Sequence, residues 1–200
     1  MRDSDNIRAV ELVGADWMGF IFWPESSRYV AERPSYLPGK VKRVGVFVNT
    51  TITDILCLVE DYSLDLIQLH GSESTGFILE LRNQLSTIKK SVGIIKAISV
   101  ASEADIVNCQ RYEPFVDYFL FDTKSDSVGG SGHQFNWDIL QSYHCSKPFL
   151  LSGGIGPDCI AQLHRFSHPQ CIGFDINSRF ELAPALKDIN KLKSFLSGIK

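Results

Sequence analysis

The chain has 200 residues, of which 44% are hydrophobic and 22% charged, and this composition predicts one globular domain over residues 1–200 with a core of ordinary size. The formal net charge of −3 and the lack of a basic block argue against a nucleic acid partner. No apolar run is long enough to cross a membrane, and the polar start M-R-D-S-D-N is not a secretory signal.

Apolar runs alternate with segments of helical spacing along the chain. Seven runs predict buried strands, at residues 17–22, 41–48, 66–69, 93–98, 118–122, 148–151 and 171–176. Helices are predicted between them, the first capped by Asp3 or Ser4, the second by Thr53, and the last running from about 186 to 195. This alternation predicts an α/β fold, a TIM (β/α)₈ barrel. The chain begins with a helix, so we expect the barrel's first strand to be missing from it.

The run Y-F-L-F-D ends in Asp122, at the carboxyl end of a strand, where a barrel carries its catalytic groups. A turn residue is the alternative interpretation, because Asp commonly follows a strand. We predict a catalytic role for Asp122. The glycines of the following loop, residues 123–135, predict a segment that closes on bound substrate.

Small residues follow the last two predicted strands. Gly153 and Gly154 come after one strand and just before a helix, and Asn177 and Ser178 follow the next strand. Glycine lets backbone N–H groups approach an anion, and barrels often bind phosphate at the loops after their last two strands. Tight turns are the alternative. Together the two loops predict a site for a phosphorylated small molecule.

Three further polar residues lie in or after predicted strands. Arg28 offers a guanidinium fork for a carboxylate, although a lone loop arginine is more often simply solvated. His70 fits a substrate-binding group and a structural histidine equally well. Lys96 lies inside an apolar strand, where we expect a carboxylate partner in the barrel mouth.

The cysteines are odd in number, widely spaced and form no C-x-x-C pair: Cys57, Cys109, Cys145, Cys159 and Cys171. They predict free thiols in a reducing cytoplasm. The five histidines show none of the close spacing of zinc ligands, so we expect no metal site.

Eight short motifs run the length of the chain: S-S-R-Y-V (26–30), V-G-V-F-V-N (44–49), Q-L-H-G-S-E (68–73), I-K-A-I (95–98), F-D-T-K (121–124), G-G-S-G…F-N-W (129–137), L-S-G-G-I (151–155) and F-D-I-N-S (174–178). In this order and spacing the chain resembles phosphoribosylanthranilate isomerase. The resemblance implies a (β/α)₈ barrel without a cofactor, acting as a monomer or homodimer. It would convert N-(5-phosphoribosyl)anthranilate to 1-(2-carboxyphenylamino)-1-deoxyribulose 5-phosphate, an Amadori rearrangement in tryptophan biosynthesis.

The resemblance also implies roles for single residues. Asp122 would be the general acid that helps to open the ribose ring, and Arg28 would hold the anthranilate carboxylate. Asp175 would contact a sugar hydroxyl. The backbone N–H groups of Gly154 and of the loop 177–178 would bind the phosphate.

One motif of the family has no match. The family opens with a strand ending in C-G-[M/I]-[T/R], whose cysteine is the general base, whereas this chain opens with Met1-Arg2-Asp3, which is similar to the end of that motif. We therefore expect a start set at an internal methionine, a truncated chain or a shortened protein, and little or no activity from these 200 residues. The alternatives are another phosphate-binding barrel, such as an indole-glycerol-phosphate synthase-like or ribulose-phosphate epimerase-like enzyme, and a non-catalytic phosphate-binding barrel.

Overall fold

The computed structural model describes residues 1–88, 90–123 and 137–199. Its main element is a curled half-barrel sheet of seven parallel strands, in which each strand pairs with the next one along the chain. The strands are β1 (Trp17–Ile21), β2 (Lys42–Phe47), β3 (Leu66–Leu69), β4 (Gly93–Val100), β5 (Tyr118–Thr123), β6 (Phe149–Ser152) and β7 (Cys171–Phe174). The predicted α/β class and its seven strands are confirmed, with ends that differ by about two residues or fewer.

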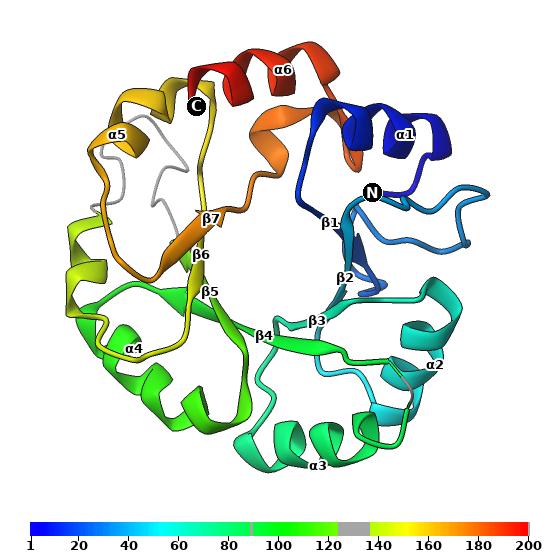
Figure 1. Cartoon of the computed structure of the whole chain (residues 1–200), viewed down its shortest axis with the longest axis vertical. Helices are drawn as coiled ribbons and strands as arrows, with labels where there is room; N and C mark the ends of the chain where they lie inside the picture. The colour runs from blue at the N-terminus through cyan, green and yellow to red at the C-terminus, as the bar shows by residue number, and fades with distance from the viewer. Residues whose placement is uncertain (89, 124–136, 200) are drawn as a thin grey trace.

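Helices lie outside the sheet and surround it (Figure 1). The α-helices are α1 (Ser4–Val13), α2 (Ile52–Tyr62), α3 (Thr75–Leu85), α4 (Glu103–Asn108), α5 (Ile160–Arg165) and α6 (Ile189–Gly198). Short 3-10 helices are η1 (Cys109–Phe115), η2 (Trp137–Ser142), η3 (Pro157–Cys159) and η4 (Ser178–Phe180). None of the described helices is long and apolar enough to span a membrane.

The structure differs from the sequence-based expectations at the start of α2 and before α6. Thr51, not Thr53, caps α2, because its side chain accepts the amide of Asp54. The last helix does not begin near 186, because Leu186–Lys187 forms β9, which pairs antiparallel with β8 (Glu181–Ala183). The loop expected to close on substrate, residues 123–135, lies outside the described residues from 124 onwards.

In the described part of the chain, β1 and β7 are the two edges of the sheet. The segment that follows β7, orange in Figure 1, passes from this edge towards α1. The Asn6 side chain of α1 exchanges two hydrogen bonds with the backbone of Lys187 in β9, at 2.9 and 2.8 Å. The β8–β9 hairpin, which lies late in the chain, is therefore bonded to α1, the helix that precedes β1.

Apolar side chains pack on both faces of the sheet. The larger cluster lies between the sheet and the helices and contains seven phenylalanines that are fully buried: Phe20, Phe47, Phe119, Phe121, Phe149, Phe180 and Phe195. A small cluster of Val44, Leu66, Ile95, Ala97 and Leu120 fills the concave face. Neighbouring strand residues point to opposite faces, so these five residues show which positions point inwards.

Lys96 has the carboxylate partner that the sequence predicted. Its Nζ lies 3.1 Å from Oε2 of Glu73, and both side chains are at most 3% exposed. The predicted location in the barrel mouth is wrong, because Lys96 shares its strand face with Ile94 of the helix-side cluster. Glu73 also accepts the amides of Asn49 and Gly71, so the pair joins the loops after β2 and β3.

Replacing Lys96 by methionine leaves the Glu73 carboxylate buried without its cation. We expect Lys96→Met to lower the free energy of unfolding by about 3 to 5 kcal/mol, the usual cost of breaking a buried ion pair. The control is Lys90→Met, which breaks the exposed Lys90–Asp65 pair and is expected to cost about 1 kcal/mol or less. Urea unfolding of both variants gives the comparison. Equal costs would contradict a special role for the buried pair.

Candidate active site

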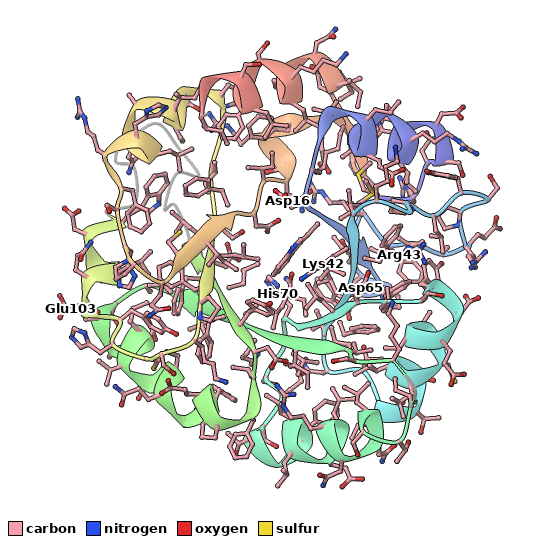
Figure 2. The ribbon with its side chains drawn as sticks, in the orientation of Figure 1. Asp16, Lys42, Arg43, Asp65, His70 and Glu103 are labelled. Carbon is pink, nitrogen blue, oxygen red and sulfur yellow. The ribbon has the colours of Figure 1, made fainter. Side chains whose placement is uncertain are left out.

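The carboxyl ends of all seven strands meet at one rim, because every strand pair is parallel. The predicted site residues follow five of these strands: Arg28 after β1, His70 after β3, Asp122 at the end of β5, Gly153 and Gly154 after β6, and Asp175, Asn177 and Ser178 after β7. Figure 2 shows His70 near the middle of the ring of strands. The fold thus brings all the predicted site residues to the same rim.

Asp122 points to the concave face, because it lies two residues after Leu120 of the concave cluster. Its Oδ2 is 3.7 Å from Nε2 of His70, and both side chains are about a third exposed. Nε2 of Gln68 lies 2.9 Å from Nδ1 of His70. With the Gln68 amide as donor, Nδ1 accepts and the neutral ring carries its proton on Nε2, facing Asp122. The two groups are therefore oriented towards one another at the open end of the sheet.

Asp175 is half-buried and is connected to the position of Asp122 through Ser152 of β6. Its Oδ2 accepts the hydroxyl of Ser152 at 2.9 Å, and Ser152 pairs in register with Asp122. Burial raises the pKa of Asp175 above its usual value, and the Ser152 hydrogen bond and the charge of Lys187 oppose that rise. A hydroxyl donor from a ligand would stabilise the Asp175 carboxylate further.

The two loops predicted to bind phosphate lie side by side. Gly153 and Gly154 have φ angles of +97° and +66°, which glycine adopts without the strain of a side chain. Arg179 bonds both carboxylate oxygens of Asp158, at 2.8 and 2.9 Å, and so ties the loop after β7 to the start of η3. Nζ of Lys187 donates to the side-chain and backbone oxygens of Asn177, at 2.6 and 3.2 Å. A cation is thereby placed beside the second loop.

The alternative interpretation of Arg28, a simply solvated surface arginine, is wrong. Its guanidinium binds the carboxylate of Glu181 through Nε and Nη2, at 2.6 to 3.0 Å. Lys187 donates to the same carboxylate at 3.0 Å. Sequence reasoning missed Glu181, because its partner Arg28 lies 153 residues before it and no local motif connects them. It also missed Lys187, whose contact with this pair is made through Glu181.

A surface hollow of about 490 Å³ lies elsewhere, near the start of β2. It is lined by Pro38, Gly39, Lys40, Val41, Lys42, Arg43, Ser63, Asp65 and Lys90. Figure 2 labels Lys42, Arg43 and Asp65 of this set. These residues lie at the amino ends of the strands, and none of the predicted site residues lines the hollow. The polar rim at the carboxyl ends is therefore the better candidate site.

Known proteins match this chain over almost its full length. The family model described as N-(5'-phosphoribosyl)anthranilate isomerase matches residues 1–198. The isomerase of Phocaeicola vulgatus is 48% identical over 200 residues, covering 100% of this chain and 95% of the relative. The isomerase of Parabacteroides distasonis is 42% identical and covers 100% and 90% of the two chains.

Solved structures of isomerases with this name superpose on the whole chain. A crystal structure in complex with reduced 1-(o-carboxyphenylamino)-1-deoxyribulose 5-phosphate gives a TM-score of 0.75 at 27% identity, covering 100% of this chain and 98% of the other. The enzyme of Thermotoga maritima gives 0.75 at 30% identity with the same coverage. Another structure of that enzyme is described as monomers generated from a dimer.

Gly153→Ala tests the phosphate loop against a matched control. Alanine at φ +97° is strained, so we expect a loss of about 1 to 3 kcal/mol in the free energy of unfolding. The control is Gly14→Ala, because Gly14 ends α1 at φ +94° with open space around it and lies far from the loop in sequence. Both variants should lose similar stability, whereas only Gly153→Ala should weaken inorganic phosphate binding measured by calorimetry. Unchanged phosphate affinity in Gly153→Ala would contradict the assignment.

Proposed function

The chain belongs to the N-(5'-phosphoribosyl)anthranilate isomerase family, and we propose that its rim site catalyses the Amadori rearrangement of N-(5-phosphoribosyl)anthranilate in tryptophan biosynthesis. The observation that carries this assignment is that Asp122, Arg28 and the two loops of the kind that binds phosphate, after β6 and β7, lie on one rim. We further propose that the protein acts in the cytoplasm on this small phosphorylated substrate, as a monomer or homodimer.

Asp122 is the proposed general acid. As the bond between C1 and the ring oxygen breaks, the protonated Asp122 carboxyl gives its proton to that oxygen, and the nitrogen lone pair forms a C1=N bond. A base then removes the proton from C2, which gives an enolamine. Protonation at C1 and loss of the proton from the C2 hydroxyl complete the ketone. His70, 3.7 Å from Asp122, adds a polar contact for the sugar at the same place.

The remaining rim residues bind the two anionic ends of the substrate. Arg28 holds the anthranilate carboxylate, because a guanidinium matches a carboxylate with two parallel hydrogen bonds. Gly153 and Gly154 form one half of the phosphate site, and Asn177 and Ser178 form the other. Asp175 accepts a hydrogen bond from a sugar hydroxyl, which favours its charged form.

Asp122→Asn keeps the shape of the side chain and removes the transferable proton. In a chain that also carries the first strand of the family, we expect kcat to fall by about 10²- to 10⁴-fold, the usual contribution of a general acid. The affinity for a product analogue should change by less than about threefold, because binding does not need the proton. The control is Asp5→Asn, an exposed carboxylate in the first turn of α1. Loss of analogue binding in Asp122→Asn would count against a purely catalytic role.

The base is proposed to come from a further strand. All five cysteines lie within the described residues, and none of them lies at the carboxyl end of a strand. We propose that an eighth strand between β1 and β7 completes a (β/α)₈ barrel and carries the cysteine that the family resemblance implies. The terminal amino group of Met1 donates to the carbonyl of Gly19 in β1 at 2.6 Å, so the chain at Met1 lies beside β1, where we propose the further strand.

Comparing the isomerase activity of residues 1–200 with that of a chain extended by such a strand tests this proposal. We expect the extended chain to be faster by about 10²-fold or more, since a positioned base contributes at least that much. An extended chain in which the cysteine is replaced by alanine is the control, and it should stay slow. Equal turnover by all three chains would show that the base is a group within residues 1–200.

A further inference from the structure

We propose that Glu181, fixed by Lys187, is a positioning residue that orients the Arg28 guanidinium for the substrate carboxylate. The inference rests on the proposed role of Arg28 as the carboxylate clamp. Arg28, Glu181 and Lys187 form the rim cluster, which joins the loop after β1 to the β8–β9 hairpin.

The contact between Arg28 and Glu181 uses one defined edge of the guanidinium. Nε donates to both carboxylate oxygens at 3.0 and 2.9 Å, and Nη2 donates to Oε2 at 2.6 Å. A guanidinium has five N–H groups, and this side-on contact leaves the end-on edge made by Nη1 and Nη2. That second edge is itself a fork that fits another carboxylate. The Arg28 side chain is 24% exposed, so a ligand reaches it from solvent.

Glu181 is held in place more firmly than the arginine that it binds. Its side chain is 5% exposed, and its Oε1 also accepts Nζ of Lys187 at 3.0 Å and the amide of Ala185 at 3.2 Å. Burial alone would raise the pKa of Glu181, but the hydrogen bonds from Arg28 and Lys187 outweigh burial and lower the pKa. The carboxylate is therefore a fixed, charged acceptor against which Arg28 aligns.

Lys187 is in turn fixed by its surroundings. Its backbone pairs with the side chain of Asn6, and its Nζ holds Asn177 as well as Glu181. The chain of contacts thus runs from Arg28, the proposed carboxylate clamp, to Asn177 of the proposed phosphate loop. Two cations and one carboxylate leave the rim cluster with one net positive charge, which suits an anionic ligand.

An arginine without such a partner samples many rotamers, so ordering its side chain costs part of the binding free energy of a ligand. Glu181 removes that cost before the substrate arrives. This gain in affinity is expected only for a ligand that carries the carboxylate, because only such a ligand binds the Arg28 guanidinium. A merely structural role of Glu181 would change the binding of every ligand at this site to a similar extent.

The experiment compares two ligands by calorimetry with residues 1–200. The first is reduced 1-(o-carboxyphenylamino)-1-deoxyribulose 5-phosphate, and the second is the same molecule without the carboxylate. We expect Glu181→Gln to weaken the first ligand by about tenfold or more, in line with the loss of a charge-assisted bidentate contact, and the second by less than about threefold. The control is Glu25→Gln, which removes an exposed charge from the loop of Arg28 and should leave both affinities unchanged.

Arg28→Gln and the double variant separate the two proposals. Arg28→Gln should weaken only the carboxylated ligand, and adding Glu181→Gln to it should cause no further loss, because Glu181 acts through Arg28. If Arg28→Gln leaves the carboxylated ligand unaffected, the clamp assignment fails, and the role of Glu181 fails with it. If Arg28→Gln has its expected effect but Glu181→Gln weakens both ligands equally, or strengthens the first, the clamp stands and the positioning role is overturned.

Glu181→Asp keeps the experiment decisive if Glu181→Gln does not fold. Aspartate keeps the charge but is one methylene shorter, so it does not reach Arg28 and Lys187 together in the present geometry. We expect a loss for the carboxylated ligand of about threefold or more, again with little change for the other ligand, since the bidentate contact is lost and the charge remains. Wild-type affinity for the carboxylated ligand in Glu181→Asp would overturn the proposal.

Discussion

The parallel pairing of all seven strands is the constraint on which the site depends. Parallel strands send their carboxyl ends to one rim, so residues that lie far apart in the sequence become neighbours there. The register then selects which side chains meet. Asp122 pairs with Ser152, and the Ser152 hydroxyl reaches Asp175 of the next strand end. A shift of β5 by one residue would turn Asp122 towards the helices and put Phe121 or Thr123 in its place at the rim.

The two ends of the proposed substrate site come from the two edges of the described sheet. Arg28 follows β1, whereas the loop of Asn177 follows β7. Side-chain contacts connect these edges, because Lys187 bonds both Glu181 and Asn177 while Glu181 holds Arg28. The distance between the carboxylate clamp and the phosphate loop is therefore set by ion pairs and by the short β8–β9 hairpin, as well as by the sheet itself.

Strands and strand-end residues were predictable from the sequence, because they depend on local patterns. The run Leu66–Leu69 is buried at all four positions and was assigned with its observed bounds. Asp122 and Gly153 were assigned because barrels place function at strand ends. Thr51 was missed as a cap because three threonines surround Ile52, and composition does not show which one adopts the extended capping conformation. β9 was missed because two residues carry too little periodicity to be distinguished from a helix start.

The rim cluster was not predictable, because its meaning lies in geometry between distant residues. Glu181 lies in R-F-E-L-A-P, where a glutamate is ordinarily a solvated surface group, and only the folded chain buries it against Arg28. Stability alone does not explain such a cluster. The cost of taking charges out of water roughly cancels their attraction, and apolar replacements of buried ion pairs are often neutral or stabilising. What an apolar replacement does not reproduce is direction, since only a carboxylate bound to Nε and Nη2 holds the other edge of the guanidinium towards the rim. Orientation of the arginine is therefore the physical property that these buried charges provide.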